Sequence, residues 1–395
     1  MRTLFGSFRH GHGFVATCFL CTLLATPFLP ITASAQDQEN STGKLAESEG
    51  LPPSSPQKPV DQSESIPRWT FSAEAIVLGR IGGANQTLVE RAPGAAPFYA
   101  TSIAPGAEAF NSNQFQRGFS AGPKVSLMYH DDSGYGVELS YFSIFNQSAT
   151  KAIGPDSPAD WLVMKAPGTF WQTQDFPYQA MAWSSATNLY SAEVDGRVDL
   201  SRRVTMLAGF RWLQLDDDLP GTLTPADLTA PTWKQLCNCT LSQISQMPPG
   251  GPAGNYPPFW NTGATNNLYG VQIGVDGKIL EFGRFSLDGL IKIGLFDNNA
   301  EQTTGVSLQK VVYPSTVTTN HAAFAREASL QLKYQLIEGL ALKAGYEALW
   351  LDGVALAPGQ IQETYSTPSN VRALGVNCRS SVLFQGATFG LEYSF

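Results

Sequence analysis

The sequence predicts an all-β protein, a ten-stranded antiparallel transmembrane up-and-down β-barrel with short periplasmic turns and long extracellular loops. Three observations lead to this prediction. Ten segments alternate apolar residues with polar or small ones, and short connections alternate with long ones. Beyond the N-terminal segment, no stretch approaches the ~18 consecutive apolar residues of a membrane helix. An exported chain without such a helix is either soluble outside the inner membrane or a barrel.

The last strand-like segment, 381–395, shows the alternation clearly. From Leu383 the odd-numbered residues are largely apolar and end in Tyr393 and Phe395, whereas the even-numbered residues are small or polar apart from Phe384. A period of two residues is that of a β-strand with different surroundings on its two faces. In a transmembrane barrel the apolar face meets lipid and the polar face lines the lumen. An edge strand of a soluble sandwich would alternate too, so the rest of the chain has to distinguish the two.

Nine further segments repeat this pattern, each with an apolar face opposite a face of small, polar or charged residues. The ten predicted strands are 69–78, 119–129, 135–145, 186–198, 204–215, 267–279, 285–295, 324–336, 340–350 and 381–395. Alternating segments separated by turn residues are typical of membrane barrels.

The connections between these strands alternate in length. Four are only a few residues long, near residues 131, 201, 283 and 338. Five are long and rich in Pro, Gly, Asn and Thr, at 80–117, 148–183, 216–265, 298–322 and 353–380. Outer-membrane barrels have short periplasmic turns and longer external loops, whereas a soluble sandwich has no reason to place every long loop at one end. Because ten is even, both ends of the barrel lie at the periplasmic rim, where strand one can close against strand ten.

Aromatic residues gather at both ends of the predicted strands. At the short-turn ends are Trp69, Phe71, Tyr129, Tyr135, Phe285, Tyr334, Tyr393 and Phe395. At the long-loop ends are Phe145, Phe210, Trp212, Tyr269, Phe324 and Trp350. Two aromatic girdles around an aliphatic band are expected at the two membrane–water interfaces.

The chain divides into three predicted parts. Residues 1–35 form a secretory signal peptide, with Arg2 and Arg9 before an apolar run and Ala33-Ser34-Ala35 as the cleavage site. Residues 36–67 form a disordered periplasmic tail, because they are rich in Gln, Glu, Ser and Pro and contain no aromatic residue. Residues 68–395 form the barrel. Removal of two arginines takes the formal charge from −8 to −10, which argues against binding to nucleic acid.

Four stretches together resemble the putative β-barrel porin family 7 of bacterial outer-membrane proteins. They are Leu207–Asp216, Asn266–Gly274, Val354–Ile361 and Gly386–Phe395, and their order and spacing carry the resemblance over about 69–395. The resemblance implies an outer-membrane barrel. It implies no established substrate and no catalytic residue.

The alternation also predicts which charged side chains face the lumen. They are Glu74, Lys124, Glu138, Glu193, Asp195, Arg197, Arg211, Asp276, Lys278, Asp288, Lys292, Glu327, Lys333, Lys343, Glu347 and Glu392. A strongly selective pore would tend to show a ring of one sign, but seven of these residues are basic and nine acidic. In a narrow barrel such charges can pair across the lumen. Since ten strands lie close to the limit at which side chains fill the interior, we expect a constricted lumen.

Three functions remain open from the sequence. The first is a narrow porin-like channel or loop-plugged barrel for small solutes. The second is a surface-exposed interaction or structural barrel that uses its long aromatic-rich loops. The third is an outer-membrane hydrolase at the loop end. There His321 lies in the fourth long loop, and four acids begin neighbouring loops, namely Asp216, Asp217, Asp218 and Asp297. An Asp/His pair could act as a general base. Because a lone loop histidine is usually solvated, we assign no catalytic residue, cofactor or metal site.

Expected partners follow from the barrel. They are outer-membrane lipid, the barrel-assembly machinery acting through Phe395, and a small solute or surface ligand, with no nucleic acid. The signal peptide and barrel predict location in the bacterial outer membrane. That compartment permits disulfides, and a bridge between Cys378 and either Cys237 or Cys239 is the pairing we predict.

Overall fold

The computed structural model describes residues 68–93, 107–156, 160–164, 178–225, 259–308, 311–367 and 370–395. The predicted signal peptide and tail lie outside these ranges, as do Cys237 and Cys239. Within the described residues no helix is long and apolar enough to span a membrane.

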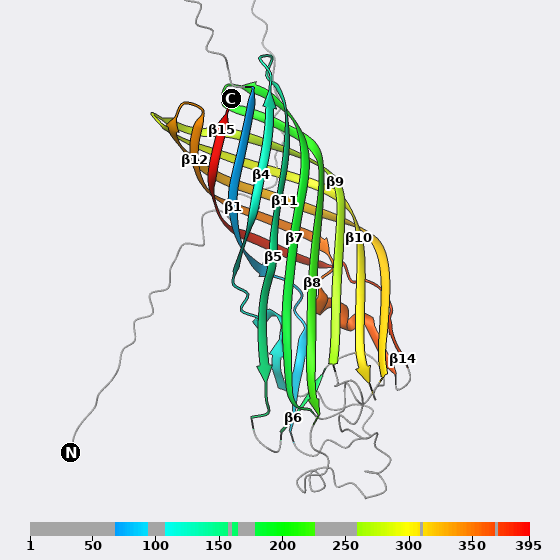
Figure 1. Cartoon of the computed structure of the whole chain (residues 1–395). Coiled ribbons are helices and arrows are strands. Elements are labelled where there is room, and N and C mark those ends of the chain that lie inside the picture. The colour runs from blue at the N-terminus through cyan, green and yellow to red at the C-terminus, as the bar shows by residue number, and fades with distance from the viewer. Residues whose placement is uncertain are drawn as a thin grey trace, which may run out of the picture. The chain divides into compact units, whose positions relative to one another are not determined.

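Ten long strands in the described ranges form one closed antiparallel barrel (Figure 1). They are β1 (Trp69–Gly82), β4 (Phe119–His130), β5 (Tyr135–Ile153), β7 (Tyr178–Ser201), β8 (Val204–Pro225), β9 (Phe259–Phe282), β10 (Phe285–Leu308), β11 (Val311–Ile337), β12 (Leu340–Val354) and β15 (Ser380–Ser394). Each pairs with the next along the chain. The ring closes where β1 pairs with β15, from Thr70 opposite Ser394 to Gly82 opposite Val382. The ten-stranded up-and-down barrel predicted from the alternation is confirmed.

The four short turns lie where the sequence predicted them, and three contain a glycine in the left-handed region. The φ angles are +86° at Gly134, +60° at Gly283 and +77° at Gly339. A residue with a Cβ rarely adopts such angles, so glycine suits these tight reversals. In the first turn, Asp131 Oδ1 accepts hydrogen bonds from the backbone N–H groups of Ser133 and Tyr135 at 3.0 and 2.9 Å.

Smaller elements fill the long-loop end. They are β2 (Thr87–Pro93), β3 (Ala107–Asn111), η1 (Ser112–Gln114), β6 (Asp160–Met164), α4 (Ala357–Gln360), η2 (Ile361–Glu363), β13 (Thr364–Thr367) and β14 (Asn370–Ala373). Strands β3, β2 and β6 extend the barrel sheet beside β7, whereas β13 and β14 pair with each other. The long-loop end is therefore built largely of further β-structure.

Several strands are about twice as long as predicted. Strands β7 to β11 contain 22 to 27 residues, whereas ~9–11 tilted residues cross a membrane. On β10 the outward face changes from Ile293 and Leu295, both about half exposed, to the exposed polar residues Asp297 and Asn299. The strand thus leaves the apolar band and continues, so Tyr269 and the other aromatics of the outer girdle lie within strands.

The boundaries of three predicted long loops are consequently wrong. The second, predicted at 148–183, is shorter at both ends, because β5 continues to Ile153 and β7 starts at Tyr178. The predicted fourth long loop, 298–322, is a hairpin in which β10 and β11 pair as far as Leu308 opposite Val311. The predicted third loop begins at 216, but β8 continues to Pro225 and β9 starts at Phe259. The predictions ended the strands where their outward faces became polar, because they looked for an apolar face. Outside the lipid, an outward strand face has no need to be apolar.

Candidate functional site: the interior of the barrel

The half of the lumen nearest the short turns contains a network of ion pairs. Arg211, 1% exposed, lies at its centre, with Nη1 2.6 Å from Glu327 Oε2 and 3.6 Å from Glu193 Oε2. Lys292 Nζ lies 2.8 Å from Glu193 Oε1 and 2.7 Å from Asp195 Oδ2. Taking charges into a low-dielectric interior is costly, and only close pairing with further hydrogen bonds repays it.

A second group of pairs lies around two lysines. Lys333 Nζ is 3.2 Å from Asp288 Oδ2 and 3.0 Å from Glu392 Oε2. Lys343 Nζ is 2.8 Å from Glu74 Oε1 and 3.4 Å from Glu392 Oε2. These residues come from β1, β10, β11, β12 and β15, so the pairs connect strands that are distant in the sequence.

Two more cations complete the network. Arg197 Nη2 lies 2.6 Å from Asp276 Oδ2, and its Nη1 binds Glu138 Oε2. Lys124 on β4 binds Glu347 on β12 across the lumen. All ten barrel strands therefore contribute a charged residue to this region, which we call the ionic layer.

Of the predicted lumen charges, Lys278 lies apart from the ionic layer. Its Nζ is 3.2 Å from Glu281 Oε1 beside the β9–β10 turn, and its side chain is 38% exposed. Neutral residues that the charge pattern did not single out also belong to the layer. Gln272 Nε2 donates to Glu193 Oε2 and Asp195 Oδ1, each at 2.8 Å. Their inward position in the alternation was the signal that could have identified them.

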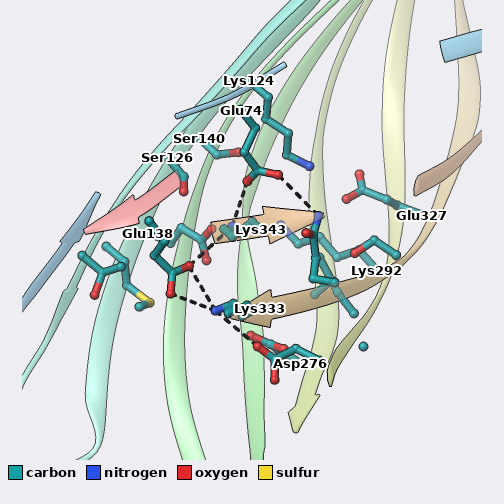
Figure 2. Close-up of a pocket in the computed structure, with 18 of the residues that line it drawn as sticks. Glu74, Lys124, Ser126, Glu138, Ser140, Asp276, Lys292, Glu327, Lys333 and Lys343 are labelled. Carbon is teal, nitrogen blue, oxygen red and sulfur yellow. Dashed lines mark hydrogen bonds and ion pairs between the residues drawn. The ribbon is translucent and has the colours of Figure 1, made fainter. Parts of the chain in front are cut away.

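The ionic layer surrounds a cavity of about 170 Å³. Figure 2 shows charged side chains from several strands converging on it, among them Glu74, Lys333 and Lys343. Asp276 and Lys333, whose side chains are 30% and 28% exposed, line the cavity. Because water reaches these groups, this half of the lumen is a hydrated vestibule.

Nearer the long loops, the inward face of the strands becomes apolar. Nine of the ten strands contribute to this apolar layer, and its larger side chains are at most 3% exposed: Ile76, Leu78, Phe142, Ile144, Leu189, Leu213, Leu215, Leu268, Phe296, Leu349, Leu351, Val382 and Phe384. The alternation had predicted a polar inward face along the whole strand. Short runs such as Ile76-Val77-Leu78 and Leu349-Trp350-Leu351, which are apolar on both faces, were the available signal.

A segment of the last long connection folds into the lumen above the apolar layer. We call Val354–Ile361 the plug segment; all eight of its residues are buried. Val354 and Leu356 pack with the apolar layer, and Ala357 and Ile361 pack with a second apolar cluster nearer the long loops. Gly353, with φ +79°, turns the chain from β12 into the lumen. A Cβ at Gly353 would lie 2.6 Å from the carbonyl oxygen of Ala322, so a side chain is excluded there.

Buried polar side chains of the barrel wall hold the plug segment by its backbone. Asn266 donates from Nδ2 to the Ala355 carbonyl and accepts from the Ala355 N–H, both at 2.7 Å. Asn298 Nδ2 donates to Asn266 Oδ1 at 2.9 Å and to the Gly353 carbonyl at 3.2 Å. Because a short irregular segment inside a barrel leaves its backbone groups without strand partners, these side chains supply the missing hydrogen bonds.

Two further contacts secure the plug segment. The Ala357 N–H donates to Asp217 Oδ2 at 2.9 Å, while the other oxygen of Asp217 accepts from Arg80 and Thr187. At the far end, Gln302 Nε2 donates to the Gln360 carbonyl at 3.2 Å. The plug segment is thus bound to β8, β9 and β10.

The residues of the hydrolase hypothesis are not brought together. His321 lies in β11 and not in a loop, and within the described ranges its side chain makes no hydrogen bond or ion pair. Asp216, Asp217 and Asp218 lie within β8 and Asp297 within β10. Asp217 is occupied by Arg80 and the plug segment. The hypothesis placed these residues in loops because the strands were predicted too short.

Cys378 is buried near the plug segment, in a cluster with Ala264, Ala300 and Ala355. Its two predicted disulfide partners lie outside the described residues, so the pairing stays a prediction. Among the described residues, no group of three or more His, Cys, Asp or Glu side chains could hold a metal ion.

The closed strand ring, the apolar outer band and the polar and plugged interior together define a porin-like outer-membrane β-barrel. More particularly, residues 179–395, over half of the chain, match the model of the family described as Putative beta barrel porin-7 (BBP7). The chain belongs to this family, as its resemblance in four motifs had predicted.

Comparison with curated proteins finds no match. Several solved barrels are similar over most of their length. The outer membrane protease OmpT from Escherichia coli shares 8% identity, with 84% of this chain and 98% of that chain covered and a TM-score of 0.45. The translocator domain of the autotransporter NalP from Neisseria meningitidis shares 8% identity, with 83% of this chain and 89% of that chain covered and a TM-score of 0.34. The toluene transporter TodX from Pseudomonas putida shares 10% identity, with 83% of this chain and 90% of that chain covered and a TM-score of 0.30.

Proposed function

We propose that this protein is a porin-like barrel of the bacterial outer membrane that is closed at rest and admits small solutes only when the plug segment leaves the lumen. The observation that carries the proposal is the burial of eight consecutive residues, Val354–Ile361, inside the barrel. An open diffusion pore would leave such a segment exposed to water.

The apolar layer supports a closed resting state. Leu349, Leu351 and Phe384 are all 0% exposed, so no water reaches them along the axis. An ion that crossed this layer would lose its hydration without gaining a polar partner, and apolar constrictions are known to gate channels by dewetting. Passage therefore requires that the plug segment move and that side chains of the apolar layer separate.

Conductance in planar bilayers tests this proposal. We expect the refolded full-length protein to give no steady current, and the double variant Asn266→Ala/Asn298→Ala to open in bursts, because it loses the bonds that hold residues 353–355. Asn299→Ala is the matched control, since Asn299 is exposed and its side chain bonds, among the described residues, to Asn320 and not to the plug segment. A steady current from the unaltered protein would show that the lumen is open at rest. A folded double variant that never conducts would contradict the proposal that release of the plug segment opens the barrel.

A second candidate function is binding at the cell surface. The observation that favours it is the extension of β7 to β11 beyond the apolar band, filled by its own apolar cluster that includes Trp183 and Trp260, both 0% exposed. Such a filled extension would present the connection 226–258 on a rigid support. If cell-surface binding is unchanged when this connection is replaced by a short turn, the candidate fails.

The proposed barrel also implies partners during its insertion into the outer membrane. Phe395, 59% exposed, ends the strand that closes the ring, and its backbone exchanges two hydrogen bonds with Trp69, at 2.9 and 3.1 Å. We propose that the barrel-assembly machinery recognises this terminal strand before it pairs with β1, and that outer-membrane lipid covers the apolar band afterwards.

A further inference from the structure

The vestibule has more acids than its own bases can neutralise. Without Lys278, the ionic layer holds nine of the predicted carboxylates and six of the predicted bases, a formal charge of −3. Each of the six bases already pairs with at least one carboxylate. A cleft lined by an excess of one sign of charge concentrates ions of the opposite sign. The excess therefore favours a cation from solution.

Four of the carboxylates that line the cavity keep one oxygen without a hydrogen-bond partner in the described residues. Asp288 Oδ1 is buried and the Glu327 side chain is only 4% exposed, so the acceptors that a ligand can reach lie on the other two carboxylates. Arg197 binds one oxygen of Glu138 and one of Asp276. In the described part of the chain, Glu138 Oε1 and Asp276 Oδ1 have no hydrogen-bond partner, and neither is among the buried polar atoms without one. Both residues line the cavity, and their side chains are 20% and 30% exposed. Two free oxygens on either side of one guanidinium suit a ligand that donates several hydrogen bonds.

Other residues that line the cavity indicate which chemical class of ligand it suits. Met128 and Leu290 give the cavity apolar wall. The described residues offer no group of three or more ligating side chains for a metal ion. A ligand with a short aliphatic body and a charged nitrogen matches this combination better than a bare ion does, because its methylene groups can contact the apolar wall.

We propose that the vestibule is a binding site for small aliphatic amines, with an ammonium group held between Glu138 and Asp276. This inference names the solute class of the proposed function and rests on it for passage through the barrel. Binding itself needs only the closed barrel, because the cavity lies on the short-turn side of the apolar layer. A failure to bind amines and a failure to conduct are therefore separate results.

Calorimetric titration of the refolded full-length protein in detergent, at low salt, tests the site with 1,4-diaminobutane as the probe. We expect saturable binding at one site and no binding of 1,4-butanediol, which has the same length but no charge. Glu138→Gln and Asp276→Asn, made separately, should each weaken binding by about tenfold or more, since each removes a charge-assisted hydrogen bond. Glu281→Gln, which removes an exposed acid beside the β9–β10 turn, should leave binding unchanged.

Three results would overturn the proposal. They are no binding of the diamine to the unaltered protein, equal binding by both vestibule variants when their circular dichroism shows a folded barrel, and displacement of the diamine by potassium chloride at equal concentration. The last result would assign the site to simple counter-ions. Conductance of the Asn266→Ala/Asn298→Ala variant would remain informative about passage in each case.

Discussion

The two halves of the lumen are filled by different kinds of side chain. Near the short turns, the interior is charged, partly hydrated and hollow. Near the long loops, it is largely apolar and is filled by the plug segment, which buried polar side chains bind. The same ring of strands runs through both halves, with all ten contributing to the ionic layer and nine to the apolar layer, and the inward residues differ, for example Glu74 against Ile76 on β1. The comparison shows that one ring of strands can be lined by charged side chains near one end and packed with apolar side chains near the other.

The largest expected effect comes from removing the central cation of the ionic layer. Arg211→Met leaves Glu327 and Glu193 buried without their guanidinium. We expect the free energy of unfolding to fall by roughly 3–5 kcal/mol, the cost of breaking a buried pair. Urea unfolding in detergent, followed by tryptophan fluorescence, measures it. Lys278→Met, at the exposed pair with Glu281, should cost about 0–1 kcal/mol. Equal losses would mean that the ionic layer is as solvated as the turn.

In the apolar half of the lumen, a substitution is expected to lower stability through lost packing and not through an unpaired charge. Leu349→Ala removes a 0% exposed side chain from the apolar layer. The expected cost is about 2–4 kcal/mol, the transfer term plus the cavity term of a buried leucine. Leu342→Ala on the same strand, where Leu342 is 47% exposed, is the matched control and should cost less. If the control is as costly as Leu349→Ala in urea unfolding, the upper lumen is not a packed core.

The smallest expected effect concerns the thiol beside the plug segment. Burial raises the pKa of Cys378 to about 11 from an ordinary value of 9.0. In the reduced protein, we expect the thiol to remain protonated and nearly unreactive to maleimide at pH 8, and to react fully in urea. The folded state holds this proton more tightly than the unfolded chain, so stability is unaffected below pH 9 and declines as the pH rises from there towards 11. Rapid labelling of the folded, reduced protein would place Cys378 at the surface.

Much of the fold was predictable because the two faces of a membrane strand meet different solvents. Residues such as Ile273 and Gln272 alternate for that reason, and the alternation located all ten strands and their closure. The strand ends were not predictable in the same way. Beyond Leu295 the outward face meets water, as at Asp297, so the contrast between the faces is lost although the hydrogen-bonded ladder continues.

The candidate site was predictable in part. Inward position identified the charges of the ionic layer, yet which acid pairs with which base depends on how the ring closes, as for Lys124 on β4 and Glu347 on β12. The plug segment was visible only as a motif, Val354–Ile361, with no sign that it lies inside the barrel.

The sequence by itself determined the class of protein, because alternation with a period of two, even strand number and alternating connections are local properties that lipid and water impose on each strand separately. Only the tertiary structure decided that an apolar layer and the plug segment fill the upper lumen. That outcome depends on side chains from nine strands meeting at one level and on Asp217, Asn266 and Asn298 binding a distant loop, and such meetings follow from the register of the whole ring.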